Sequence, residues 1–358
     1  MKKLLAILMV ICMLAAFAAA CDGGSPGEKT VGISMPTKEL QRWNQDGDNM
    51  KEAFENAGFK VELQYADNDH PTQVSQIESM IASGVDVLVI AAIEGGRLTQ
   101  VLADAKSKGI AVIAYDRLIM GTDAVSYYAT FDNWKVGTLQ GTYLEEKLNL
   151  KAGGGPYYIE FFTGDPGDNN INFFFGGAME VLQPYLVNGT LECLSGQTLI
   201  AQVATIQWDS GNAKTRMENL ITAHNYSPNG QRLDAVMCSN DSTAQGVTAA
   251  LQGAGFTADT FPLITGQDCE KTSVINIIAG YQSMSVFKDT RTLANQTVKM
   301  VEALLNGETV PVNNTTDYDN GTGIIPTFIC DPVFGDANNF EALLIDSGYY
   351  TKADLNLD

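Results

Sequence analysis

The chain has few of the residues that catalytic and nucleic-acid-binding sites require. It contains only two histidines, His70 and His224, and it has no C-x-x-C, no G-x-S-x-G and no G-x-x-x-x-G-K-[ST]. The sequence therefore supports neither a zinc site, nor a nucleophilic hydrolase, nor a nucleotide-hydrolysing loop. No basic run follows Lys2–Lys3, and the formal net charge is -20, which argues against nucleic acid as a partner. The acidity favours a soluble monomer.

Long apolar runs are confined to the N-terminus. The charged start Met1–Lys3 leads into the apolar residues 4–17, and three alanines then precede Cys21. This pattern predicts a secretory signal peptide over residues 1–20, too short for an ordinary spanning helix. Small residues directly before a cysteine resemble a bacterial lipobox, which predicts a lipid on Cys21 and a flexible tether over 21–29. We therefore expect an extracytoplasmic protein, lipid-anchored to the cell membrane or periplasmic.

Cysteine is also scarce in the mature chain. Removal of Cys12 with the signal peptide and lipidation of Cys21 leave four thiols, at Cys193, Cys238, Cys269 and Cys330. Outside the cytoplasm these four residues can form two disulfides, with three possible connectivities. Buried free thiols are the alternative, and the sequence leaves both open.

What the chain does have is a repeated alternation of strands and helices. The stretch KGIAVIAYDRL (108–118) runs a short apolar strand into Asp116 and Arg117, and TFPLITGQD (260–268) runs a second one into Asp268. Short apolar runs of this kind are typical of parallel strands buried on both faces. The ends of such strands are where open α/β sheets bind ligands. The chain of 358 residues is long enough for two domains. We therefore predict two similar α/β halves, each presenting an aspartate to a shared place.

Further polar and aromatic residues follow other predicted strands. Hydrogen-bonding groups of both charge signs are combined with tryptophan, which suits a sugar, because each hydroxyl donates and accepts and charged partners make stronger hydrogen bonds. The apolar face of a pyranose packs well on an indole. Trp43 and Trp208 have polar neighbours, RWNQDGDN and QWDSGN, so we expect both to be partly exposed in a cleft. The full set is Arg42, Trp43, Asp116, Arg117, Asp168 to Asn170, Trp208, Asn240, Asp241, Asp268 and Lys288.

Seven dispersed motifs then reveal a resemblance to a known family. They are SQIESMIASGVDVLVIAAIEG (75–95), IAVIAYDRLI (110–119), YYATFDN (127–133), GDPGDNN (164–170), SND (239–241), TGQD (265–268) and VFKDTR (286–291). In these motifs the chain from about 30 to 350 resembles the type I periplasmic sugar-binding proteins of ABC importers, in particular the multiple-monosaccharide and D-xylose-binding subfamily.

The resemblance implies two doubly wound parallel-sheet lobes joined by a three-segment hinge, with a monosaccharide between them. We expect an N-terminal lobe of residues 30–132 plus 289–322 and a C-terminal lobe of residues 133–288 plus 323–358. The function implied is delivery of an aldose of the xylose, glucose, galactose or arabinose class to an ABC permease by cleft closure, with no cofactor, no metal and no catalysis. The sugar contacts carried over by motif are Arg42, Trp43, Asp116, Arg117, Asn169 or Asn170, Trp208, Asn240, Asp268 and Lys288.

Three other functions were weighed against transport. A sugar-responsive transcriptional regulator needs a basic N-terminal DNA-binding motif, and this N-terminus is a signal sequence instead. A glycosidase needs two carboxylates flanking the scissile bond, and Asp116 with Asp268 could mimic such a pair. A receptor that signals to a membrane sensor kinase or a chemoreceptor would use the same closed lobes, so the sequence does not separate it from a transport protein.

Overall fold

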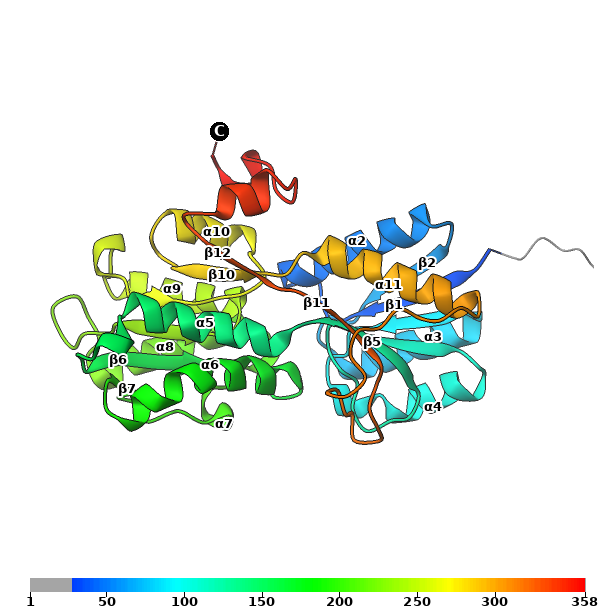
Figure 1. Cartoon of the computed structure of the whole chain (residues 1–358), viewed down its shortest axis with the longest axis horizontal. Coiled ribbons are helices and arrows are strands. Elements are labelled where there is room, and N and C mark those ends of the chain that lie inside the picture. The colour runs from blue at the N-terminus through cyan, green and yellow to red at the C-terminus, as the bar shows by residue number, and fades with distance from the viewer. Residues whose placement is uncertain (1–27, 358) are drawn as a thin grey trace, which may run out of the picture.

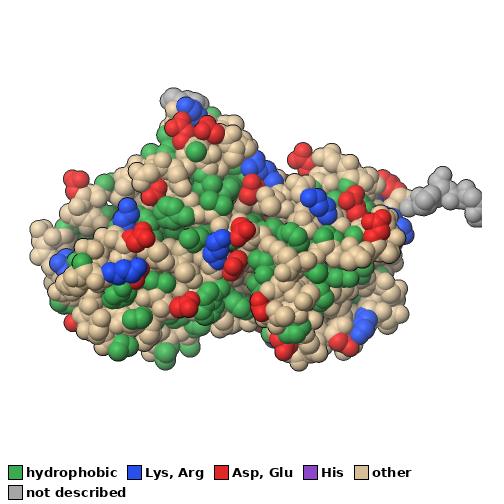
Figure 2. All heavy atoms as spheres, in the orientation of Figure 1, with side chains coloured by type: hydrophobic (Ala, Val, Ile, Leu, Met, Phe, Trp, Pro, Cys, Tyr) green, Lys and Arg blue, Asp and Glu red, His purple; other side chains and the backbone are tan. Residues whose placement is uncertain are grey.

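The computed structural model describes residues 28–357 and has two α/β lobes side by side (Figure 1). The predicted signal peptide, Cys21 and most of the tether lie outside the described residues. Within residues 28–357 no helix combines the length and the apolar character needed to cross a bilayer. The space-filling view shows the lobes meeting along a seam, with acidic side chains spread over both (Figure 2).

The N-terminal lobe is built on a six-stranded sheet of order β11-β5-β4-β3-β1-β2, in which every neighbouring pair is parallel. Helices α2 and α11 pack on one face of the sheet and α3 and α4 on the other, so the central strands are buried on both sides. The strands are β1 (Thr30–Met35), β2 (Lys60–Tyr65), β3 (Val87–Ile90), β4 (Ala111–Tyr115), β5 (Val125–Phe131) and β11 (Thr327–Cys330). The helices are α2 (Gln41–Asn56), α3 (His70–Ser83), α4 (Thr99–Ser107) and α11 (Thr290–Leu305).

The C-terminal lobe has a parallel four-stranded sheet of order β7-β6-β8-β9 and an antiparallel pair, β10-β12. A parallel bridge between Gln267 and Val286 joins the two parts. The strands are β6 (Tyr157–Phe162), β7 (Leu191–Glu192), β8 (Ala235–Cys238), β9 (Leu263–Ile264), β10 (Met284–Phe287) and β12 (Val333–Asp336). The helices are α5 (Asn133–Lys147), α6 (Asn170–Val187), α7 (Ile200–Val203), α8 (Ser210–His224), α9 (Asp241–Gly253) and α10 (Lys271–Ile278).

Short helical turns complete the chain. The turns are Gly95–Arg97, Leu150–Ala152, Ile206–Trp208, Ala258–Thr260, the π-helical Glu341–Ile345 and Ala353–Leu355. After the two-residue strand β7 the chain turns toward β6, where the buried Glu160 accepts a hydrogen bond from Ser195 Oγ at 2.6 Å.

Among the described residues, the chain passes between the lobes at 131–133, 287–290 and 330–333 (Figure 1). Asp132 and Asp289 cap helices α5 and α11 at the first two passages by accepting backbone N–H hydrogen bonds from Lys135 and Arg291. The third passage corrects the predicted boundary at residue 323. Strand β11 pairs with β5, so residues 327–330 extend the N-terminal sheet, and only β12 joins the C-terminal lobe.

The cysteines within residues 28–357 are free rather than joined in disulfides. Cys238, Cys269 and Cys330 are buried thiols and Cys193 is half-buried. Of the two alternatives that the sequence left open, the structure has the second. Burial raises the pKa of the Cys193 thiol to about 11, so this thiol is protonated and unreactive at neutral pH.

Helices α5 and α6 cross in backbone contact because each contributes a glycine to the crossing. A Cβ atom on Gly137 would lie 2.0 Å from the Phe174 carbonyl oxygen, and one on Gly177 would lie 2.2 Å from the Trp134 carbonyl oxygen. Neither position has room for a side chain. The crossing holds α6, whose N-terminal turn and Phe174 face the seam between the lobes, against the helix that follows the first passage.

Candidate functional site

A pocket lies between the lobes, with a volume of about 370 Å³ that includes its open side. Its lining combines residues from the carboxyl ends of strands in both lobes, as expected for ligand sites in open α/β sheets. Eight of the ten predicted ligand contacts line it: Arg42, Trp43, Asp116, Arg117, Trp208, Asn240, Asp268 and Lys288. The other lining residues are Leu40, Asp168, Phe174, Gln267 and Glu270.

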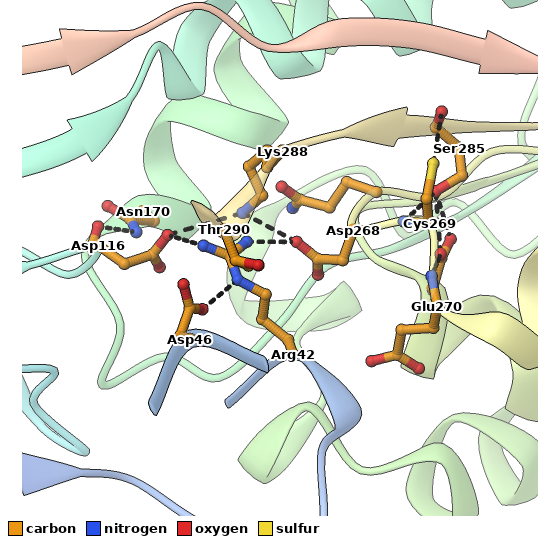
Figure 3. A network of polar contacts seen from close by, with 12 residues as sticks. Arg42, Asp46, Asp116, Asn170, Asp268, Cys269, Glu270, Ser285, Lys288 and Thr290 are labelled. Atoms are coloured by element: carbon orange, nitrogen blue, oxygen red, sulfur yellow. Dashed lines mark hydrogen bonds and ion pairs between the residues drawn. The ribbon is translucent and has the colours of Figure 1, made fainter. Parts of the chain in front are cut away.

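Arg42 is the centre of an ion-pair network that spans the seam (Figure 3). Its guanidinium group lies 2.9 Å from Asp116 of the N-terminal lobe and 2.7 Å from Asp268 of the C-terminal lobe. Asp46, one turn further along α2, accepts a third hydrogen bond from the same group. Lys288 Nζ lies 3.1 Å from the Asp268 carboxylate and 3.8 Å from that of Asp116. The two aspartates that the repeated strand pattern singled out therefore meet at one arginine and one lysine.

A second ion pair crosses the seam beside the first. Arg117 Nε of the N-terminal lobe lies 2.9 Å from the Asp168 carboxylate of the C-terminal lobe. The Arg117 guanidinium also lies 4.9 Å from the centre of the Trp43 ring, within range of a cation–π contact. All three cations that line the pocket are thus paired with carboxylates, and none is left to attract a charged ligand.

Three pocket residues hold a left-handed backbone conformation, which non-glycine residues rarely adopt. The φ angles are 56° at Asp116, 56° at Trp208 and 95° at Asp268. Each such residue costs on the order of 1–3 kcal/mol, and strain of this kind collects at ligand and catalytic sites. At Asp116 the conformation is held by its carbonyl oxygen, which accepts hydrogen bonds from Tyr128 at 2.6 Å and Thr130 at 3.0 Å.

The two asparagines predicted as alternatives do not line the pocket. Asn170 Nδ2 donates to the Asp116 carbonyl oxygen at 2.8 Å, so this side chain crosses the seam to hold the backbone of a pocket residue. Asn169 faces away, since its side chain accepts a hydrogen bond from Asn172 at 3.2 Å. The physical reason is that α6 begins at Asn170, within the segment predicted as a loop, and the helix start turns Asn169 outward. Asp168 takes the pocket position instead.

The prediction that the tryptophans are partly exposed is wrong. Trp43 and Trp208 are each only 4% exposed, because each packs into the apolar core of its own lobe. Trp208 packs against the backbone of Gly164, where a Cβ atom would lie 2.0 Å from the indole. Its Nε1 is buried and has no hydrogen-bond partner among the described residues. Both indoles nonetheless line the pocket, so they can still meet a ligand there.

The charged groups of the pocket differ in how readily they ionise. Burial alone would raise the pKa of Asp116, but the charges of Lys288, Arg42 and Arg117 outweigh it and hold that pKa below its usual value. Burial raises the pKa of Asp46 to about 6 despite the neighbouring Arg42. Of the two carboxylates of the N-terminal lobe that contact Arg42, Asp116 therefore ionises more readily than Asp46.

Sequence reasoning missed four lining residues and the supporting carboxylate of Asp46, whereas Asp241 was among the candidates. Gln267 and Glu270 flank Asp268, and their position after the same strand was the available signal. Phe174 stands in an apolar FFF run that looks like ordinary core, and Leu40 gives no signal at all. Asp46 could have been found by its spacing of four residues from Arg42 on a helix. Asp241 accepts hydrogen bonds from Ser285 Oγ and the Glu270 N–H, both at 2.9 Å or less, and so shapes the loop after β9.

The raised pKa of Glu270 predicts how the stability of the protein depends on pH. Burial and the nearby Asp268 raise its pKa to about 7, and only Gln245 donates a side-chain hydrogen bond to it, at 2.7 Å. Between the unfolded pKa of about 4.5 and pH 7 the folded protein keeps a proton that the unfolded chain releases, so stability falls as pH rises through this window. Glu270→Gln should therefore increase the free energy of unfolding by about 2 kcal/mol more at pH 8 than at pH 5.

Urea unfolding of both proteins at the two pH values measures this difference. Glu218→Gln, an exposed glutamate on α8, is the matched control and should change stability equally at pH 5 and pH 8. A pH-independent effect of Glu270→Gln would contradict the assignment.

The sequence and the fold are similar to those of known proteins. Residues 31–309 match the family described as periplasmic binding protein domain. The chain is 50% identical over 326 residues to the multiple sugar-binding periplasmic protein SbpA of Azospirillum brasilense, covering 90% of each. It is 47% identical over 346 residues to the multiple sugar-binding periplasmic receptor ChvE of Rhizobium radiobacter, covering 96% of this chain and 95% of that one.

A solved structure of a solute-binding protein is also similar to this chain. An ABC transporter solute-binding protein from Clostridium phytofermentans with bound β-D-glucose superposes with a TM-score of 0.89 and 58% identity, covering 91% of this chain and all of the other. The overall fold of this chain is thus shared with a solute-binding protein of known structure. The chain belongs to the periplasmic binding protein family, and it is a binding protein rather than an enzyme.

Proposed function

We propose that the pocket binds a single neutral aldopyranose of the glucose and xylose class. The observation that carries the proposal is the charge pairing across the seam: Arg42 and Lys288 contact both Asp116 and Asp268, and Arg117 contacts Asp168. A carboxylate on a ligand would find no uncompensated cation among the described lining residues. Sugar hydroxyls can accept from these cations and donate to these carboxylates, and such charge-assisted hydrogen bonds are stronger than neutral ones.

The aromatic residues supply the apolar part of the site. Trp43, Phe174 and Trp208 line the pocket beside the ion pairs, and the apolar face of a pyranose suits such rings. Closure of the lobes about the passages at 131–133, 287–290 and 330–333 expels water, so each polar contact becomes stronger. The sugar favours the closed form by its greater affinity for it. The names of the relatives, which bind multiple sugars or glucose, support the same ligand class.

A thermal-unfolding screen with D-glucose and D-xylose tests the proposal. A ligand at about 100 times its Kd adds about 3 kcal/mol to the free energy of unfolding, so the melting temperature should rise by several degrees. Sorbitol is the matched control, because it carries the hydroxyls of glucose without the ring, and it should leave the melting temperature unchanged. No rise with any aldose would refute the proposal.

The bound sugar is passed to an ABC permease, and a lipid on Cys21 keeps the protein at the membrane. The small residues before Cys21 support the lipid anchor. The similarity of this chain to an ABC transporter solute-binding protein supports a permease as the partner. A mass spectrum of the mature N-terminus decides the first point, since an unmodified Cys21 would exclude the anchor. Co-purification of membrane proteins with this chain tests whether its partner is a permease. Recovery of a sensor kinase in place of a permease would favour the receptor alternative, which the name of one relative supports.

A further inference from the structure

The segment after β12 is a C-terminal tail, residues 337–357, that belongs by packing to the C-terminal lobe. Its Leu344, Tyr350 and Leu355 form a small core with Cys269, Val274 and Phe287 of that lobe. Lys271 at the start of α10 forms an ion pair with Asp354 of the tail. Figure 1 shows the tail, in red, lying over α10.

One hydroxyl group of this tail joins the two lobes. Tyr350 Oη donates a hydrogen bond to the Cys269 carbonyl oxygen at 2.9 Å, within the C-terminal lobe. The same oxygen accepts hydrogen bonds from Gln41 Nε2 at 2.8 Å and Gln45 Nε2 at 2.9 Å, both on α2 of the N-terminal lobe. Tyr350 is buried, with 4% of its surface exposed, whereas Gln41 and Gln45 are half-buried, so these bonds are partly shielded from water.

The partners of Tyr350 are the immediate neighbours of pocket residues. Gln41 precedes Arg42, and Cys269 follows Asp268, the two residues whose ion pair at 2.7 Å spans the seam. Gln41 also accepts a hydrogen bond from the Lys271 N–H at 3.1 Å. The hydroxyl therefore ties together the two backbone segments that carry Arg42 and Asp268, from the side opposite the pocket.

A second tail residue contacts the N-terminal lobe. Tyr349 Oη lies 3.0 Å from Thr290 Oγ1, at the start of α11, and Asn49 of α2 donates to the same Thr290 oxygen at 2.7 Å. The Arg291 guanidinium lies 4.9 Å from the centre of the Tyr349 ring. The tail thus contacts both N-terminal-lobe helices that meet beside the second passage.

We propose that Tyr350 is a positioning residue that latches the closed lobes and thereby sets the rate of ligand release. Its acceptor and its donors belong to different lobes, so all three hydrogen bonds exist together only in the arrangement described here. Opening of the seam must break the two bonds from α2, and each such bond stabilises the closed form by about 1 kcal/mol. The latch touches no pocket atom, so it acts on the equilibrium between open and closed forms rather than on the ligand directly. The kinetic part of the proposal rests on the proposed sugar-binding function.

Stopped-flow tryptophan fluorescence with D-glucose on the full mature chain tests the latch. Tyr350→Phe keeps the ring and removes the hydroxyl, and it should raise the dissociation rate about tenfold while the association rate changes less than about twofold. Tyr143→Phe is the matched control, because Tyr143 donates to the Ser283 carbonyl oxygen at 3.1 Å within the C-terminal lobe alone. Its dissociation rate should equal that of the wild type. An unchanged rate in Tyr350→Phe, or an equal rise in the control, would overturn the latch.

A change on the other lobe shows whether Tyr350 acts through α2. Gln45 Oε1 has no hydrogen-bond partner among the described residues, so Gln45→Met removes only the bond to Tyr350. We expect this variant to speed dissociation as well, and the double variant to dissociate no faster than Tyr350→Phe alone. Fully multiplied effects in the double variant would show that the two side chains act independently. If Tyr350→Phe is poorly folded by circular dichroism, the Gln45→Met rate decides the question.

Small-angle X-ray scattering without any ligand separates the latch from the sugar-binding proposal. The ligand-free Tyr350→Phe protein should have a larger radius of gyration than the wild type, because its lobes spend more time open. Equal radii would overturn the latch even if glucose binds. Failure of the wild type to bind any aldose would overturn the proposed function, and the scattering comparison would still decide the latch.

Discussion

Replacement of Asp268 by Asn should weaken the binding of D-glucose by about 100- to 1,000-fold. The carboxylate accepts a hydrogen bond from Arg42 at 2.7 Å and forms an ion pair with Lys288 at 3.1 Å, and all three side chains are buried. A neutral amide leaves two buried cations with one counter-charge fewer and offers the sugar a weaker acceptor. Asn is chosen because it tolerates the left-handed backbone at this position, with φ of 95°, better than Ala does. Isothermal titration calorimetry measures the change.

The control for this variant is Asp104→Asn on the exposed face of α4. Asp104 also forms an ion pair, with Lys108 at 3.0 Å. Both side chains are about half exposed, and neither lines the pocket. Exposed pairs contribute little, so the affinity for glucose should match that of the wild type. Wild-type affinity for both glucose and xylose in Asp268→Asn would exclude Asp268 from the binding site.

Gly137→Ala should lower the free energy of unfolding by at least about 3 kcal/mol. A Cβ atom at this position would lie 2.0 Å from the Phe174 carbonyl oxygen and 2.8 Å from the Ala178 nitrogen, and both atoms belong to the backbone of α6. Backbone cannot rotate out of the way as a flexible side chain can, so the two helices must separate. Urea denaturation followed by circular dichroism measures the loss.

Gly253→Ala is the matched control for the helix crossing. Gly253 is the last residue of α9, and a Cβ atom there would have no heavy atom within 4 Å. Alanine favours the helix over glycine by about 1 kcal/mol at most, so this variant should be as stable as the wild type or slightly more stable. An unchanged unfolding midpoint in Gly137→Ala would show that the crossing is looser than described here.

The main features of the site follow from local sequence. Asp116 and Asp268 were predicted because each ends a short apolar strand, and a buried parallel strand needs continuous apolar residues on both faces. The carboxyl ends of such strands share one edge of their sheet, so residues that follow them gather there. The same reasoning placed Arg117, Asn240 and Lys288 at the seam, and the structure has them in the lining of the pocket.

The parts that the sequence missed depend on contacts between distant segments. The start of α6 at Asn170 turns Asn169 outward, and nothing in GDPGDNN states where the helix begins. Trp43 and Trp208 are buried because each packs against core residues that come from several segments of its own lobe. Strand β11 was assigned to the wrong lobe because its pairing with β5 joins residues about 200 positions apart in the chain. Residue patterns within one segment cannot specify such pairings.

The pairing of Arg42 with Asp116 and Asp268 has a consequence for unloading. The charge of Arg42 is balanced by carboxylates of the same chain, so no counter-ion has to bind when the ligand leaves. The empty pocket therefore contains no unpaired arginine. Ligand binding then exchanges one set of hydrogen-bonding partners of the pocket residues for another, so the net free energy of binding is modest. A protein with the proposed function can therefore release its sugar without taking up an ion to balance the charge of the site.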